Sequence, residues 1–244
     1  MAAVSGLFFF GLWILGPRIA VGEIPPAAFW LLTLAGGAHV LWFSPKMHGD
    51  PPEWRGWGAA AADGTRPGAF AACWRSYAGM TAVFAVLLLA GTAIFNPGAL
   101  AAVRARAVLV KFSGYVVFGL VQAAVFFGFV MSRVRAAIPR PADSAGVPWH
   151  RAATALATAA IFALYHGPNA PLMLLGLPMA FVWGWLYYRW PNLPLLGLSH
   201  AILGTLLNRV ALLPMRIGPF YERPDLYLLR TVVPGARRLI GNLY

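Results

Sequence analysis

The chain has 244 residues, of which 60% are hydrophobic and 11% are charged, and its mean hydropathy is +0.68. An ordinary soluble domain cannot bury that much apolar surface, so the composition excludes one. Nineteen Lys and Arg against seven Asp and Glu give a net charge of +12, and the basic residues lie mostly between apolar runs. This distribution is typical of membrane proteins, so we expect the lipid bilayer as a partner and no nucleic acid.

Two apolar runs come first in the chain. Residues 4–15 have no basic residue before them and no clear small-residue cleavage site, so we interpret them as a retained span rather than a signal peptide. Residues 27–43 form the second run, which ends at Ser44-Pro45 because the residue before a proline disfavours helical geometry. This run contains His39, which we interpret as a packed or interface histidine.

Residues 45–76 form the longest polar interruption, with several prolines and glycines and with tryptophans beside arginines. Tryptophans in this setting favour the headgroup level, so we interpret the segment as a surface loop, with a functional lid as the alternative. The single cysteine, Cys73, excludes an intramolecular disulfide. We expect it to be a small buried hydrophobic residue.

Five more apolar runs follow, at residues 77–95, 107–131, 152–166, 171–188 and 193–213. Runs of this length predict an all-α, polytopic transmembrane helix bundle of about seven spans in a bilayer of about 30 Å. Lys and Arg are more frequent after the second, fourth and sixth runs, which favours a cytoplasmic N-terminus. We expect an integral protein of the bacterial inner (cytoplasmic) membrane.

The sequence divides into three parts. N-terminal spans occupy residues 1–106, a core bundle residues 107–213, and a basic interfacial tail residues 214–244. The tail carries arginines and tyrosines between prolines. The prolines exclude one continuous helix, so we expect at most a short amphipathic helix over residues 225–233.

The fifth run ends in Phe162-Ala163-Leu164-Tyr165-His166, followed by Gly167-Pro168. A histidine is costly in hydrocarbon, so His166 is a site hypothesis. Phe162 and His166 are four residues apart and share one face of a helix. The Ala- and Thr-rich run before them predicts a central helix, closed onto its neighbours through Ala153, Ala157 and Ala160.

Three stretches, in this order, resemble the motifs of the CPBP family, which includes CAAX prenyl endopeptidases and bacterial intramembrane glutamic proteases. Phe162 to His166 resembles the second motif, Phe-x-x-x-His. Residues 184–189 with Leu198-Ser199-His200-Ala201 resemble the third, and residues 122–128 fall on the first, Glu-Glu-x-x-x-Arg-Gly. The resemblance covers residues 107–213 and implies a CAAX-protease-like core with a remnant site at Gln122, Phe162, His166 and His200.

The chain departs from the family where the chemistry is expected. In the family a first-motif glutamate activates water while histidines position the reacting groups, but Gln122 and Ala123 stand at both glutamate positions here. An amide cannot accept the proton, so Gln122 cannot be the general base. Phe127 replaces the arginine, and Gly204 replaces the Asn or Asp that follows the third-motif histidine.

These departures predict a non-catalytic homologue, a pseudo-protease that serves as an interaction module or accessory subunit with other integral membrane proteins as partners. One alternative is an endopeptidase in which His166 or His200 is the base and Gln122 an oxyanion donor. A second is a haem- or pigment-binding subunit with His39, His166 or His200 as an axial ligand. Two histidines without a carboxylate or thiolate make an incomplete zinc site, so we assign no metal and no cofactor.

Three polar side chains within hydrocarbon must still be satisfied. We expect Gln122, His166 and His200 to point into the bundle and to hydrogen-bond one another, backbone carbonyls or a trapped water. Burial disfavours the imidazolium form, so both imidazoles should be neutral.

Overall fold

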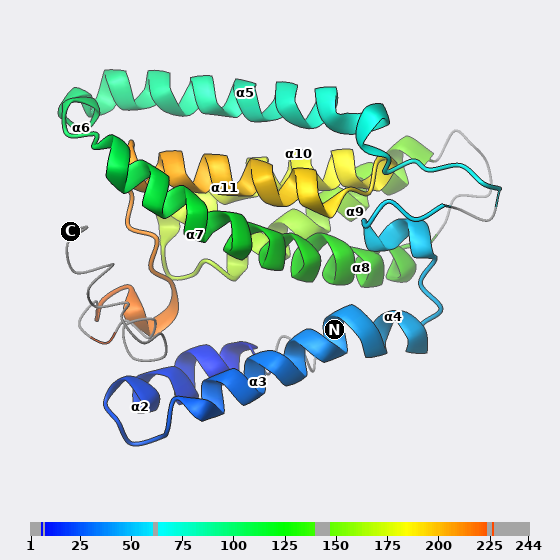
Figure 1. Ribbon diagram of the computed structural model, residues 1–244, viewed down its shortest axis with the longest axis horizontal. Coiled ribbons are helices and arrows are strands. Elements are labelled where there is room, and N and C mark those ends of the chain that lie inside the picture. Colours follow the sequence, from blue (N-terminus) through cyan, green and yellow to red (C-terminus); the bar gives the residue numbers. More distant parts are fainter. Residues whose placement is uncertain (1–5, 7, 61–62, 140–146, 224–225, 227–244) are drawn as a thin grey trace.

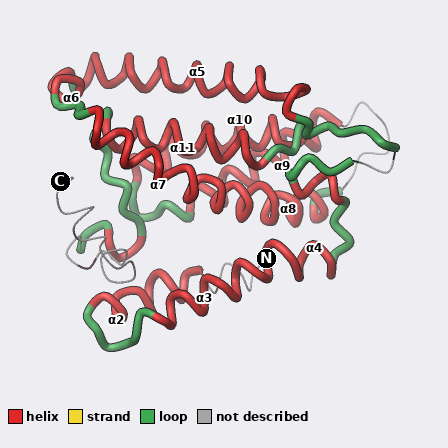
Figure 2. The backbone as a smooth tube through the Cα atoms, viewed as in Figure 1, coloured by secondary structure: helices red, strands yellow, loops and turns green. Residues whose placement is uncertain are grey.

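The computed structural model describes residues 6, 8–60, 63–139, 147–223 and 226. The described residues form helices joined by turns and loops and contain no strand, which confirms the predicted all-α class (Figures 1 and 2). The predicted helix over residues 225–233 lies outside the described residues, apart from residue 226. The acidic residue Asp143 lies outside them as well.

Most of the helices form longer segments in chain order. The first is η1 (Phe10–Leu15) with α2 (Gly16–Ala20), followed by α3 (Ala27–Ala38) with η2 (His39–Phe43) and α4 (Ser44–Met47), and then by α5 (Phe70–Phe95) and the short α6 (Pro97–Ala101). The core segments are α7 (Ala105–Ala123) with η4 (Ala124–Val130) and α8 (Met131–Ala137), then α9 (Val147–Leu164), α10 (Ala170–Arg189) and α11 (Leu193–Arg209). Single turns occur at η3 (Pro52–Arg55) and η6 (Gly218–Phe220).

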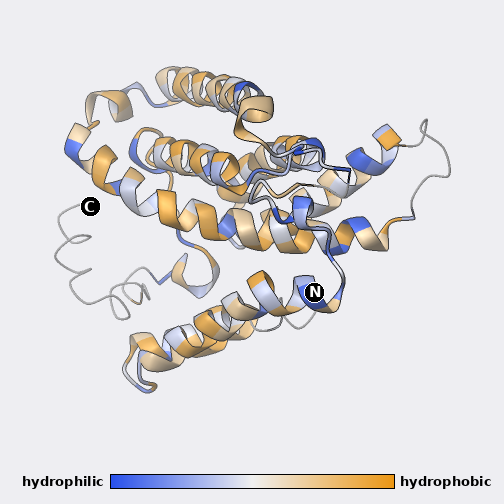
Figure 3. Cartoon of the chain, turned by 45° about the vertical axis from the view of Figure 1, so that its right-hand side comes forward, coloured by the Kyte–Doolittle hydropathy of each residue, from blue (hydrophilic) through white to orange (hydrophobic). Residues whose placement is uncertain are grey.

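Four segments are long and apolar enough to cross a membrane: Ala27–Met47, Phe70–Phe95, Ala105–Ala137 and Ala170–Arg189. The shorter Phe10–Ala20, α9 and α11 lie where the other three runs were predicted. The chain is therefore a polytopic helical membrane protein, whereas seven crossings remain a prediction. In Figure 3 the hydrophilic residues gather mainly at helix ends and in connecting loops, as expected for helices in a bilayer.

Several predicted bounds are corrected by the structure. The second run, predicted to end at Ser44-Pro45, stays helical to Met47, because Pro45 lies in the first turn of α4, where its missing N–H is tolerated. The third run, predicted from residue 77, begins at Phe70, because the chain becomes helical before the apolar stretch starts. The last run, predicted to end at residue 213, ends at Arg209. Leu212 has a φ of 57°, and this left-handed residue turns the chain back onto the bundle.

The hydrophobic core lies among the segments from α7 to α11. Its largest fully buried side chains include Phe127, Trp183 and Tyr187. α9 packs closely on α10, where a Cβ on Gly184 would lie 3.2 Å from the Cα of Ala155. The buried face of α9 in this region consists of Thr154, Ala155, Thr158 and Ala159. The predicted close-packing residues Ala153, Ala157 and Ala160 are only half-buried, one position off that face.

The loop at residues 45–76 packs on the turn between α10 and α11. The amide of Leu193 donates to the carbonyl of Gly56 at 2.8 Å, and the Tyr187 hydroxyl donates to the carbonyl of Trp54 at 2.9 Å. This loop lies at the opposite end of the bundle from the turn between α9 and α10 (Figure 1). The surface-loop interpretation therefore fits better than a lid over the His166 turn. Cys73 is fully buried, as expected.

Candidate functional site

His166 lies in the turn that follows α9, two residues beyond the last helical residue, Leu164. Its Nδ1 is 2.8 Å from the carbonyl oxygen of Phe162. A carbonyl can only accept, so Nδ1 carries the proton and Nε2 is left as an acceptor in the neutral ring. The ring centroids of Phe162 and His166 are 4.6 Å apart, so the two side chains lie together as predicted, although His166 lies beyond the end of the helix.

His200 is brought to the site by the close approach of α7 and α11. A Cβ on Gly119 would lie 2.6 Å from the carbonyl oxygen of Gly197, and one on Gly197 would lie 2.9 Å from the Cα of Leu120. Only glycines permit backbones to approach so closely. The His200 side chain is buried and lies beside Gly119, where an added Cβ would stand 3.4 Å from the His200 Cβ.

Ser199, Trp183 and Thr81 lie on three different helices and form a hydrogen-bonded group next to His200. Ser199 accepts from the indole N–H of Trp183 at 2.9 Å, and its own hydroxyl donates to the Oγ1 of Thr81 at 2.7 Å, because the Thr81 proton goes to the carbonyl of Tyr77. The Trp183 ring then lies 5.3 Å from the His200 ring, and Phe162 lies 6.1 Å from it. Ser199 thus bonds across helices.

His166 and His200 line one small cavity of about 30 Å³. Its other described lining residues are Phe162, Leu172, Gly176, Met179, Trp183, Leu203, Gly204, Leu207 and Met215. A space of this size holds about one water molecule, and the two imidazoles are its polar side chains. The two family histidines and Phe162 are therefore brought together as expected, and none of the described lining residues is acidic.

Gln122 is not among the described lining residues of this cavity. The residue is half-buried, and its Oε1 is buried without a hydrogen-bond partner in the described part of the chain. The expected bond from this oxygen to a histidine is thus not present there. A π-helical stretch begins at Ala124, immediately after the first motif's glutamate positions. A π-helical turn contains more residues than an α-helical turn. Side chains after it therefore point in directions that the regular 3.6-residue period does not predict.

Ala123 and Phe127 face the core instead. Each is 1% exposed, and the Phe127 ring centroid lies 6.2 to 6.3 Å from those of Phe162, Trp183 and Tyr187. The places of the family's second glutamate and arginine are therefore filled by a methyl group and a benzyl ring within an aromatic cluster. At Gly204 the ring of Tyr115 lies 2.5 Å from where a Cβ would stand, so an aromatic ring occupies that side as well.

Other histidines and a buried amide complete the description. His39 is half-buried and packs edge-on against Phe129, with ring centroids 6.1 Å apart, as a packed histidine does. Sequence reasoning missed His150, which is buried and lies 2.7 Å from the Tyr188 hydroxyl through Nδ1. It also missed the role of Asn169, a fully buried residue that caps α10 and holds a distant segment. The hydrogen-bond partners of His150 and Asn169 lie 38 and 45 residues away in the sequence, so local sequence patterns cannot predict these bonds.

Residues 104–206 match the model of a family described as type II CAAX prenyl endopeptidase Rce1-like. The match contains all three motif-bearing stretches and nearly coincides with the predicted core at residues 107–213. No curated protein and no solved structure matches the chain.

Proposed function

We propose that this chain keeps the helical bundle of the Rce1-like family of type II CAAX prenyl endopeptidases, whose model residues 104–206 match, without the family's acid–base chemistry. It would act as an interaction module or accessory subunit of a complex in the bacterial inner membrane. Its partners would be other integral membrane proteins.

The observation that carries this proposal is the burial of Ala123 and Phe127 in the aromatic core. A hydrolytic water needs a base within hydrogen-bond reach, and neither side chain can accept a proton. The Phe127 ring is enclosed by three other aromatic rings. The position therefore lacks both the carboxylate and the space that a carboxylate with its water would need.

The structure describes five acids, Glu23, Asp50, Glu53, Asp63 and Glu222, and three of them have partners elsewhere. Asp50 pairs with Arg133, and Asp63 accepts from the amide and hydroxyl of Thr65 at 2.9 and 2.6 Å. Glu23 lies 4.0 Å from Arg18 at the surface. None of these acids is among the described lining of the histidine cavity, which supports the loss of catalysis.

The two candidate spans before the matched region supply surface for a partner. In both Ala27–Met47 and Phe70–Phe95 only 11% of the apolar window is buried within the chain. Gly36 and Gly37 on α3 and Gly79 and Gly91 on α5 have open space where a Cβ would stand. Small residues of this kind allow a second transmembrane helix to approach closely.

Co-purification from native membranes tests the proposal. The tagged full chain, crosslinked before solubilisation, should bring down one integral membrane protein in fixed stoichiometry. Gly36→Leu and Gly79→Leu should reduce its recovery, because each adds bulk to a proposed contact. Gly114→Leu on α7 is the matched control, since it adds the same bulk at an exposed glycine outside the two spans. A chain recovered alone under all conditions would contradict the accessory role.

A further inference from the structure

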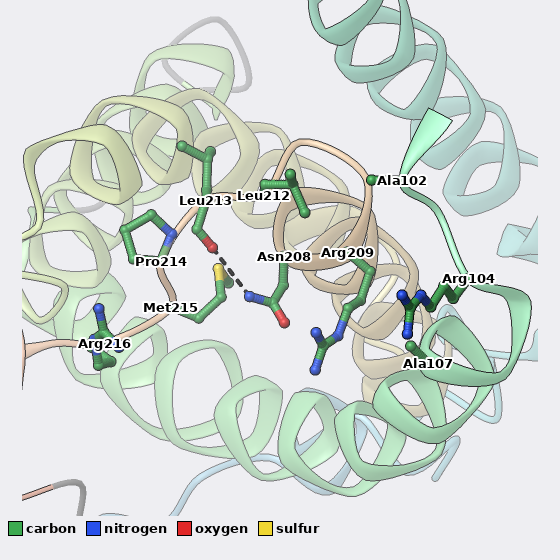
Figure 4. A pocket seen from close by; sticks show the side chains of 10 residues that line it. All are labelled: Ala102, Arg104, Ala107, Asn208, Arg209, Leu212, Leu213, Pro214, Met215 and Arg216. Atoms are coloured by element: carbon green, nitrogen blue, oxygen red, sulfur yellow. Dashed lines mark hydrogen bonds between the residues drawn. The ribbon is translucent and has the colours of Figure 1, made fainter. Parts of the chain in front are cut away.

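A second and larger cavity, of about 520 Å³, lies where α7 begins and α11 ends (Figure 4). Its described lining comprises Ala102, Arg104, Ala107, Asn208, Arg209, Leu212, Leu213, Pro214, Met215 and Arg216. We call it the basic cavity, because three of these residues are arginines and none of the ten is acidic. Its volume is in the range of sites that bind small ligands.

One wall of the basic cavity is held in place by a buried amide. Asn169 Nδ2 donates to the carbonyls of Pro214 and Arg216 at 2.6 and 3.0 Å. The amide of Gly218 donates to the carbonyl of Gly167 at 2.8 Å, which fixes the next turn of the same segment. The wall formed by Pro214, Met215 and Arg216 is therefore positioned by the protein itself.

Asn208 supplies an unused acceptor to this cavity. The residue is 6% exposed, and its Nδ2 donates to the carbonyl of Leu213 at 3.1 Å. Its Oδ1 is buried and has no hydrogen-bond partner among the described residues. Figure 4 shows its amide and the Arg209 guanidinium extending in the same direction from α11. A buried acceptor of this kind calls for a donor from a ligand.

The charges around the cavity call for an anion. Lys111, two turns into α7, is close enough to Arg209 for the two positive charges to repel, and its Nζ lies 4.5 Å from the Tyr115 ring centroid. Arg216 contributes a buried Nε with no hydrogen-bond partner in the described chain. Guanidinium groups match phosphate oxygens in pairs, and basic pockets between transmembrane helices bind phosphate head groups.

We propose that the basic cavity binds a hydroxylated phosphate group of the glycerol phosphate type. Arg104, Arg209 and Arg216 contact the phosphate oxygens, and a hydroxyl of the ligand donates to Asn208 Oδ1. Because α7 starts and α11 ends beside the cavity, the ligand lies at headgroup level. Met215 lines both this cavity and the histidine cavity, so the ligand lies next to the family motifs. This site does not depend on whether the chain is catalytic.

The test uses the purified full chain in phosphatidylcholine nanodiscs. Phosphatidylglycerol is added as the lipid probe and read by native mass spectrometry, and glycerol 1-phosphate and inorganic phosphate are titrated as soluble probes. At least one of the phosphate probes should bind, and Arg209→Gln and Arg216→Gln should each weaken it at least tenfold. Binding of the lipid alone identifies a head group as the source, whereas equal binding of a soluble probe identifies free phosphate.

Arg106→Gln is the matched control, since Arg106 is exposed at the same end of α7, outside the described cavity lining, and loses the same charge. It should change binding less than twofold. Asn208→Leu should reduce the preference for phosphatidylglycerol over phosphatidic acid, which lacks the head-group hydroxyls. Arg104→Gln alters an exposed side chain and so keeps the test valid if the buried variants fail to fold. The proposal is overturned if none of the phosphate probes binds, or if Arg106→Gln weakens binding as much as the cavity variants do.

Discussion

Gly119 on α7 and Gly197 on α11 face each other so closely that a Cβ on Gly119 would lie 2.6 Å from the carbonyl oxygen of Gly197. This contact sets the separation of the two helices at the level of His200. It therefore positions the third-motif histidine against the second-motif turn.

Gly197→Ala should destabilise the bundle, since its Cβ would meet the backbone of Leu120 at 2.9 Å and a helix would have to move. We expect a loss of about 1 to 3 kcal/mol in unfolding free energy, the usual cost of overpacking. Denaturant unfolding in detergent micelles measures it. Gly114→Ala on α7 is the control, because nothing lies within 4 Å of its added Cβ. Equal effects from the two substitutions would show that the contact is unimportant.

Ser199→Ala should also destabilise the fold. It removes the acceptor of the Trp183 indole N–H, whereas Thr81 keeps its bond to the carbonyl of Tyr77 at 2.7 Å. A buried donor left without a partner costs about 1 to 3 kcal/mol. Unfolding followed by tryptophan fluorescence should report both the loss and a changed Trp183 environment. Ser113→Ala, which removes only an exposed bond within α7, should have little effect.

Asn169→Ala should release the segment at residues 214–216. Two hydrogen bonds to that segment are lost, and the first turn of α10 loses its side-chain cap. Hydrogen exchange should rise at residues 215–218 and remain unchanged in the loop at residues 45–76. Asn192→Ala is the counterpart, since Asn192 caps α11 and donates to Gly68 in that loop. The reverse pattern of exchange would contradict the assignment.

The sequence predicted the helices and the histidine pair well, for a physical reason. Apolar length follows from the bilayer, and the four-residue spacing of Phe162 and His166 follows from helix geometry. The orientation of Gln122 was not predictable, because the close packing of α7 on α11 at Gly119 and Gly197 decides which face of α7 meets the histidines, and local spacing does not carry that information. The basic cavity was also missed, because Arg104 and Arg209 are 105 positions apart by number and meet only in the fold.

Restoring acids through Gln122→Glu and Ala123→Glu should not create a peptidase. Phe127 and Tyr115 still fill the neighbouring space, and Gln122 is not among the described lining residues of the histidine cavity. A charge at the helix centre costs about 2.5 to 3.5 kcal/mol on insertion scales, so the double variant should also be less stable. Peptidase assays and thermal unfolding of the same sample measure both effects. Activity gained by the double variant would show that the acids alone were missing.

Hydrolysis by the purified full chain in nanodiscs tests the central claim most directly. The wild type, His166→Ala and His200→Ala are compared on a prenylated peptide and on a transmembrane peptide. We predict no turnover by the wild type above the level of the two variants. Turnover by the wild type that is abolished by either substitution would contradict the account and identify an active endopeptidase built on the histidine cavity.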